Sequence, residues 1–363
     1  MAGTCAFCGF TGKLTGEHVF GDWLSKIGLD LSPTPHQGGP LNRIGRDLGL
    51  TPPFHTKVKD VCGPCNNGWM SNLEVVAKRV LTPFILGKPG VIQPADLGAI
   101  AAWVQKTALV TMLVSSEEDR VGGYGLPPSE YQNLSSIRDD IVPLPASRFW
   151  IGRYEPGRRS ASTWVTPFIV DVDGYRDAEV PHGYLMTVIV GQLLLHGVQF
   201  TTPVLEVSVA TNLGLPVLWP SPEPVEWPRG SALTDAGFFS FADGRDLQVR
   251  EPGATLRRWT PATDLPDSRV VGSMIELPLA CGKHVGYYPA RLKVEALRGR
   301  VSAFMTWCEC PKAYLVQTES DGARLKAEGP LDAIQASYEA LPGEEELMEV
   351  PDGRFFCKHL RPS

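Results

Sequence analysis

The segment VCGPCNNGW, residues 61–69, contains two cysteines separated by two residues, and CAFC, residues 5–8, has the same spacing. Two residues between thiolates let both sulfurs of a pair reach one tetrahedral ion at about 2.3 Å. In a chain expected in the cytoplasm, such close pairs indicate metal ligands before disulfides. We therefore predict a structural Zn²⁺ site, with four unrelated buried thiols as the alternative. Its ligands are Cys5, Cys8, Cys62 and Cys65.

Polar residues adjoin both cysteine pairs. Glu17 and His18 follow the first pair, and Asn66 comes directly after the second. A zinc ion held by both pairs would bring these three side chains together. Oxygen atoms of Glu17 and Asn66 suit a hard cation such as Mg²⁺ or Mn²⁺, which stabilises charge on a phosphate. His18 has a side chain that titrates near neutrality, so it can serve as a general base.

In this combination the residues resemble the HNH, or ββα-metal, nuclease superfamily, and the order Cys-Cys-acid-His-Cys-Cys-Asn also occurs in phage recombination endonuclease VII. The strings CAFCG, EHVFGDWL and VCGPCNNGWMSNLE look like bacterial and phage HNH-type proteins. The resemblance covers residues 5–80. It implies His18 as the general base, Glu17 and Asn66 as ligands of a catalytic Mg²⁺ or Mn²⁺, and the four cysteines as structural zinc ligands. It also implies a phage or defence-related role.

The expected fold class is α+β, with three sections. Residues 1–90 are expected to form a zinc-stabilised ββα-metal domain, and residues 91–271 an accessory α+β domain. Residues 272–363 are expected to form a C-terminal α+β section. After residue 148, strand-like runs alternate with turn residues, which indicates a mostly antiparallel sheet in the larger region.

The C-terminal section has three points rich in metal-binding side chains. Any four of the six groups could form a second zinc site, and buried free thiols are the alternative. The six residues are Cys281, His284, Cys308, Cys310, Cys357 and His359.

Composition and charge limit the partners. The 363 residues are 43% hydrophobic and 20% charged, which excludes a disordered chain. A net charge of −6 disfavours a protein that coats nucleic acid with its whole surface, yet residues 1–90 carry nine basic and six acidic side chains. No apolar run approaches the ~18 residues of a membrane span. The first residues, MAGTCAFCGF, do not resemble a signal peptide, so we expect a cytoplasmic protein without a membrane partner.

Three functional hypotheses follow. The first is a metal-dependent HNH endonuclease that hydrolyses phosphodiester bonds of nucleic acid, with DNA as the expected substrate. The second is a zinc-stabilised module that binds nucleic acid or protein and has lost its nuclease centre. The third is a different enzyme housed in the larger domain. A protein partner could bind through residues 91–363. The sequence does not decide whether the nucleic acid is DNA or RNA, which nucleotide sequence is preferred, or which oligomeric state the protein has.

Overall fold

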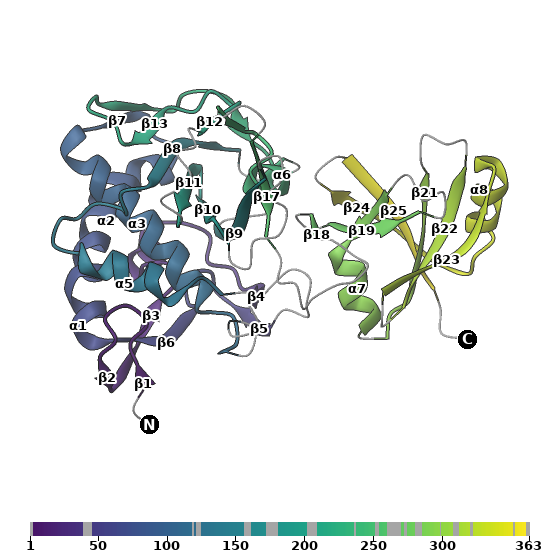
Figure 1. Ribbon diagram of the computed structural model, residues 1–363, viewed down its shortest axis with the longest axis horizontal. Helices are drawn as coiled ribbons and strands as arrows, with labels where there is room; N and C mark the ends of the chain where they lie inside the picture. Colours follow the sequence, from purple (N-terminus) through teal and green to yellow (C-terminus); the bar gives the residue numbers. More distant parts are fainter. Residues whose placement is uncertain are drawn as a thin grey trace. The chain divides into compact units, whose positions relative to one another are not determined.

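The computed structural model divides the chain into two compact units, which are described separately below (Figure 1). The first unit contains residues 1–39 and 46–261, and the second contains residues 40–45 and 262–363. The structure describes residues 3–38, 46–117, 120, 125–155, 161–171, 181–201, 209–235, 237–250, 254–259, 270–271, 274–279, 285–297, 299–307, 312–319, 322–350 and 353–360.

The first unit begins with a small β-hairpin and a second pair of strands that leads into a helix. Strand β3 (Leu14–His18) pairs antiparallel with β6 (Lys57–Cys62), and α2 (Ser71–Ile85) follows β6 after two short turns. This gives a strand–strand–helix order. The smaller elements here are β1 (Gly3–Thr4), β2 (Thr11–Gly12), η1 (Asp22–Lys26), β4 (Thr34–Gly38), β5 (Arg46–Thr51), α1 (Gly63–Cys65) and η2 (Asn66–Met70).

The β3–β6 pair contains a β-bulge that keeps two valines on the same side. Thr15 pairs with Val61 and Glu17 pairs with Val58, so β6 has one more residue than β3 between these pairs. Residues three apart in a regular strand face opposite sides. Because of the bulge, Val58 and Val61 are both buried.

Helix α3 (Pro94–Met112) lies between α2 and the main sheet of this unit (Figure 1). It begins with a proline and has Asp96 in its first turn, both of which favour a helix start. Every residue from Leu97 to Val110 is buried, including the polar Gln105, Lys106 and Thr107. None of the helices in the described parts of the chain has the length and apolar character that a bilayer span requires.

The main sheet has the strand order β13-β8-β11-β10-β9-β17, with β15 added to β8. All its pairings are antiparallel except β15 with β8. Its two central strands are buried along their whole length, because α3 covers one face and α6 the other. The elements of this region are β7 (Gly90–Ile92), α5 (Pro128–Ser136), β8 (Ser147–Tyr154), β9 (Ala161–Asp171), β10 (Gly183–Val190), β11 (Leu193–Phe200), β12 (Val209–Thr211), β13 (Val217–Trp219), β14 (Val225–Trp227), β15 (Ala232–Leu233), α6 (Phe238–Ala242), β16 (Leu247–Val249) and β17 (Thr255–Arg258).

The second unit is a five-stranded antiparallel sheet in the order β23-β22-β21-β25-β24. Helix α8 packs on one face through Ile334 and Tyr338, and α7 with the β19–β20 hairpin packs on the other. The elements are β18 (Val270–Val271), β19 (Met274–Pro278), β20 (Val285–Pro289), α7 (Ala290–Leu297), β21 (Ser302–Trp307), β22 (Ala313–Glu319), β23 (Gly322–Gly329), α8 (Leu331–Glu339), β24 (Gly343–Val350) and β25 (Gly353–Leu360).

The prediction of a mixed α+β protein with mostly antiparallel sheets is confirmed. The boundary expected near residue 90 falls inside the first unit, because one hydrophobic core runs from Phe7 through α2 and α3 to Trp227. The boundary expected near residue 271 lies ten residues after the end of this unit at Pro261.

Candidate functional site

Four cysteines from both ends of the strand–strand–helix segment meet at one point. Cys5 follows β1 and Cys8 lies in the next turn, whereas Cys62 ends β6 and Cys65 ends α1. Their sulfur atoms all lie within 4.8 Å of one another, and the Cys8 and Cys62 sulfurs are 3.6 Å apart. A tetrahedral zinc site with bonds of about 2.3 Å has sulfurs about 3.8 Å apart. The cluster therefore fits the zinc site expected from the sequence.

Backbone geometry explains why the first pair can converge. Gly9 has a φ of 72°, in the left-handed region that favours glycine, and its N–H donates to the Cys5 carbonyl at 2.9 Å. The N–H of Cys62 donates to the Cys5 sulfur at 3.4 Å. Burial raises the pKa of the Cys65 thiol well above its usual value. Zinc ligation requires thiolates, so a bound ion would offset this cost and contribute to folding.

The paired strands β3 and β6 form the hairpin of this site, and neighbouring residues of β3 face its opposite sides. Glu17 is opposite Val58 and both are buried. His18 is opposite Lys57, and this pair faces outward, with Lys57 exposed. We call the outward side, with Gly16, His18 and Lys57, the open face of the hairpin. The expected catalytic pair thus separates into one inward and one outward residue.

The inward Glu17 belongs to a buried ionic network that joins three elements. Lys106 of α3 lies 3.3 Å from the Glu17 carboxylate and 2.5 Å from that of Glu74 in α2. The Trp23 indole N–H donates to the other Glu74 oxygen at 2.6 Å. A side chain at Gly21 would collide with Glu74 and Trp23, so a glycine lets this contact form.

Two carboxylates around one ammonium decide the ionisation of Lys106. Burial acts to lower its pKa, but Glu74 and Glu17 outweigh burial, so the pKa lies above its usual value. Burial raises the pKa of Glu17 against the opposing effect of Lys106. The lysine is therefore a cation, and burial disfavours the charged form of Glu17.

The outward His18 is accessible and has polar neighbours. Its side chain is 24% exposed, and Nε2 lies 4.0 Å from Asp22 Oδ1. Burial, and after it the positive charge of Lys57, lowers the pKa of His18. A histidine with a lowered pKa is neutral at pH 7 and can accept a proton. His18 therefore has the state that a general base needs.

Asn66 lies next to the strand that carries Glu17 and His18. Its side-chain Nδ2 donates to Thr15 Oγ1 at 3.1 Å and to the Gly16 carbonyl at 3.2 Å. Asn66 thus joins the first turn after Cys65 to β3, but the expected convergence of the Glu17, His18 and Asn66 side chains is not seen, because Glu17 is paired with Lys106. These bonds connect it to the Thr15 hydroxyl and the Gly16 carbonyl of β3, whereas the Glu17 carboxylate points into the core.

The arrangement at Glu17 does not fit the divalent metal ion implied by the resemblance. Mg²⁺ demands near-octahedral coordination and usually keeps several water ligands. Glu17 is only 6% exposed, and the Lys106 ammonium lies beside its carboxylate. A divalent ion at this carboxylate would add positive charge next to a buried lysine. Glu17 is therefore unsuited to be a ligand of a catalytic divalent ion.

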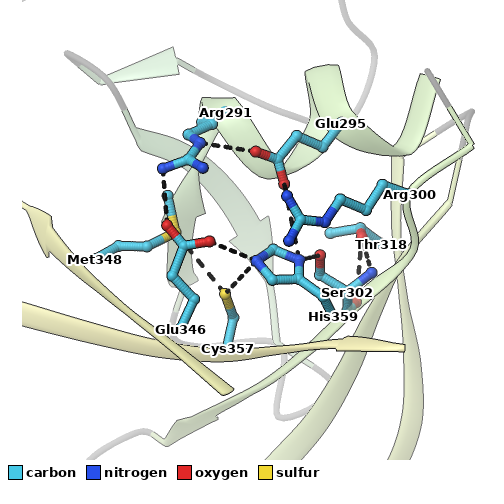
Figure 2. A network of polar contacts seen from close by, with 9 residues as sticks. All are labelled: Arg291, Glu295, Arg300, Ser302, Thr318, Glu346, Met348, Cys357 and His359. Carbon is cyan, nitrogen blue, oxygen red and sulfur yellow. Dashed lines mark hydrogen bonds and ion pairs between the residues drawn. The ribbon is translucent and has the colours of Figure 1, made fainter. Parts of the chain in front are cut away.

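The possible second zinc site can be followed for two of its six residues. Cys281, His284, Cys308 and Cys310 lie outside the described residues. Cys357 and His359 lie two residues apart on β25, with Cys357 Sγ 4.0 Å from His359 Nε2 (Figure 2). Burial raises the pKa of Cys357 to about 12.

Both ring nitrogens of His359 have hydrogen-bond partners. Nδ1 contacts Ser302 Oγ at 2.8 Å and Nε2 contacts Glu346 Oε2 at 2.6 Å (Figure 2). Arg291 in turn donates to Glu346 at 2.9 Å. Among the residues that the structure describes, the four N-terminal cysteines are the group that could hold a metal ion. In this structure His359 takes part in a network of hydrogen bonds within the second unit.

Sequence reasoning missed Lys106 as a partner of Glu17. A lysine inside the run AIAAWVQKTALV, residues 99–110, was the available signal. A charge in a helix that is apolar on every side needs a buried partner of opposite charge. The sequence does not reveal which carboxylates provide it.

No family model, curated protein or solved structure matches this chain.

Proposed function

We propose that this protein is an endonuclease that hydrolyses phosphodiester bonds in nucleic acid, with His18 as the general base. The observation that carries the proposal is the outward position of a neutral histidine on a hairpin tied to the following helix by four cysteines. The resemblance of residues 5–80 to HNH nucleases agrees with this strand–strand–helix order. DNA is the expected substrate.

Positive charge near His18 supports a phosphate ligand. Lys57 lies opposite His18, and the exposed Lys59 follows it in β6. An ammonium beside the open face attracts the phosphate backbone and reduces its charge. The Asp22 carboxylate near His18 is itself ion-paired with Lys26, which limits its repulsion of a phosphate.

The chemistry assigned to the open face is proton transfer to His18 coupled to displacement at phosphorus. His18 accepts a proton from water, and the water oxygen forms a bond to phosphorus as the bond to the leaving sugar oxygen breaks; the leaving oxygen takes up a proton from solvent. Lys57 stabilises the negative charge that develops on the phosphate. Asn66 holds the turn against β3, which fixes the helix relative to the histidine.

Plasmid cleavage by the zinc-loaded full chain tests this proposal. His18→Gln should reduce the cleavage rate about 10²–10⁴-fold, since a general base contributes that much. Arg153→Gln is the control, because this exposed residue lies on β8 of the main sheet and does not act on the pKa of His18. Zinc content and circular dichroism should be unchanged in both variants. Undiminished cleavage by His18→Gln would refute the assignment.

A second candidate is a zinc-stabilised binding module without hydrolytic activity. The pairing of Glu17 with Lys106 favours it, because that carboxylate does not fit the metal ion of an HNH centre. This reading predicts binding to a labelled DNA duplex, weakened by Lys57→Ala but not by Lys78→Ala, with no cleavage by the wild type. Cleavage that is lost in His18→Gln would exclude it.

A further inference from the structure

We propose that Lys106 is the resident cation of the Glu17 site, so that Glu17 in the folded protein binds this ammonium instead of a divalent metal ion. The inference rests on the proposed function, because it describes the inner side of the same hairpin. It departs from what the resemblance implies for Glu17, and it stands on the contacts made by α3.

The position of Lys106 is fixed by the fold and not by a flexible surface contact. Its side chain has 0% exposure, and its neighbours along α3, Gln105 and Thr107, are also buried. The ammonium lies 3.3 Å from Glu17 and 2.5 Å from Glu74, whose side chains are 8% and 17% exposed. A fully buried lysine needs such partners, because an unpaired buried charge is strongly unfavourable.

Hydrogen-bond donors reach both carboxylates of this network without a metal ion. The Lys106 ammonium donates to Glu17 and to Glu74. The Trp23 indole N–H donates to the second oxygen of Glu74. The Glu74 carboxylate therefore has two donors in a nearly closed environment. A divalent ion on Glu17 would lie close to the ammonium, where repulsion is little screened.

The burial of Glu17 also excludes the hydration that a hard cation retains. Val58 lies opposite Glu17 in the hairpin and is 4% exposed, so the inner side of the hairpin is apolar apart from the ionic network. Mg²⁺ usually keeps several waters, and a residue that is only 6% exposed has little contact with solvent from which to hold them. An ammonium has no such shell to retain once it has carboxylate partners.

Manganese titration of the zinc-loaded full chain, followed by the electron paramagnetic resonance signal of free Mn²⁺, tests the first half of the proposal. Wild type and Glu17→Gln should bind the same number of Mn²⁺ ions with the same affinity. An ion that the wild type binds and Glu17→Gln loses, or binds more than tenfold more weakly, would overturn it.

Thermal unfolding tests the second half. Lys106→Met should lower the unfolding midpoint of the first unit by about 10 °C, because it leaves two buried carboxylates without their cation. Adding Glu17→Gln to Lys106→Met should recover part of this loss. Lys78→Met, which replaces an exposed lysine of α2, is the control. It should leave the unfolding midpoint unchanged, and adding Glu17→Gln to it should give no gain in midpoint. A double variant no more stable than Lys106→Met would overturn the proposal.

Two features keep these tests decisive. Where Lys106→Met does not fold, the Mn²⁺ comparison uses only the wild type and Glu17→Gln and still gives the answer. Neither measurement uses cleavage. Loss of the proposed nuclease function would therefore show in the His18→Gln assay alone, and failure of the lysine assignment would show in the Mn²⁺ and stability data alone.

Discussion

Replacing Glu130 by glutamine should remove a large pH dependence from the stability of the first unit. Glu130 lies in the first turn of α5, is 4% exposed, and its Oε2 has no hydrogen-bond partner among the described residues. Burial raises its pKa from 4.5 to about 7, with the Tyr184 hydroxyl partly opposing the shift. The folded state therefore retains a proton that the unfolded chain releases.

The sign and size of the effect follow from linkage. Because the pKa of Glu130 is higher in the folded than in the unfolded state, protonated Glu130 stabilises the fold. This stabilisation is complete below the unfolded pKa of 4.5 and is lost as pH rises through about 7. Each pKa unit corresponds to about 1.4 kcal/mol, so the full effect is roughly 3 kcal/mol. Between about pH 5.5 and pH 8 the wild type should lose about 2 kcal/mol that the Glu130→Gln variant keeps.

Urea unfolding followed by tryptophan fluorescence measures this difference. Eight of the nine tryptophans belong to the first unit, so the signal reports mainly on that unit. Glu226→Gln, which replaces an exposed carboxylate on β14, is the matched control. The free energy of unfolding of Glu130→Gln relative to wild type should increase with pH, whereas that of the control should not. An equal difference in unfolding free energy at about pH 5.5 and about pH 8 would refute the reasoning.

Three further outcomes are expected. Cys62→Ser should lower the zinc content by one ion per chain, measured by inductively coupled plasma mass spectrometry, and should destabilise the first unit, since structural zinc contributes folding free energy; an unchanged zinc content would disprove the four-cysteine site. Gly191→Ala should lower the free energy of unfolding in urea by about 1–3 kcal/mol, because φ is +56° and the new methyl group would collide with the Ile85 carbonyl. Gly28→Ala is the control: φ is +94° but the space around it is open, so its free energy of unfolding should fall less. Burial lowers the pKa of His196 to about 3, so the folded state excludes a proton and loses stability as pH falls below about 6.5. The double variant Thr187→Val/His196→Leu, which removes both hydrogen-bonding partners, should show a shallower loss of stability in acid; an identical acid slope would contradict this assignment.

Local spacing was sufficient to predict the cysteine cluster, whereas the strand–strand–helix order around it was implied by the resemblance to HNH nucleases. Two C-x2-C pairs constrain where their sulfurs can lie, and residues 5–8 and 62–65 converge as that constraint requires. The helix expected from residue 94 is also present as α3. These features depend on contacts between a few residues at fixed spacing.

The environment of Glu17 depends on a contact that local patterns do not encode. Glu17 and Lys106 are 89 positions apart, and they meet because α3 packs between α2 and the sheet. Spacing indicated that Glu17 and His18 would lie near Asn66, but it did not show that the two neighbours face opposite sides. Side-chain direction in a short strand depends on register, and the bulge in β6 adjusts that register.

Because side chains alternate between the two sides of a strand, this register decides which residues of β3 face the core and which face solvent. Glu17 contacts Lys106 and His18 faces solvent because they are the second and third residues after Thr15. Their positions in the strand, and not their residue types, decide these surroundings. One residue added between Gly16 and Glu17 would itself take the inward position opposite Val58, and it would move the Glu17 carboxylate to the outward position, away from Lys106. In this strand, a change in length should therefore be more damaging than almost any change in composition.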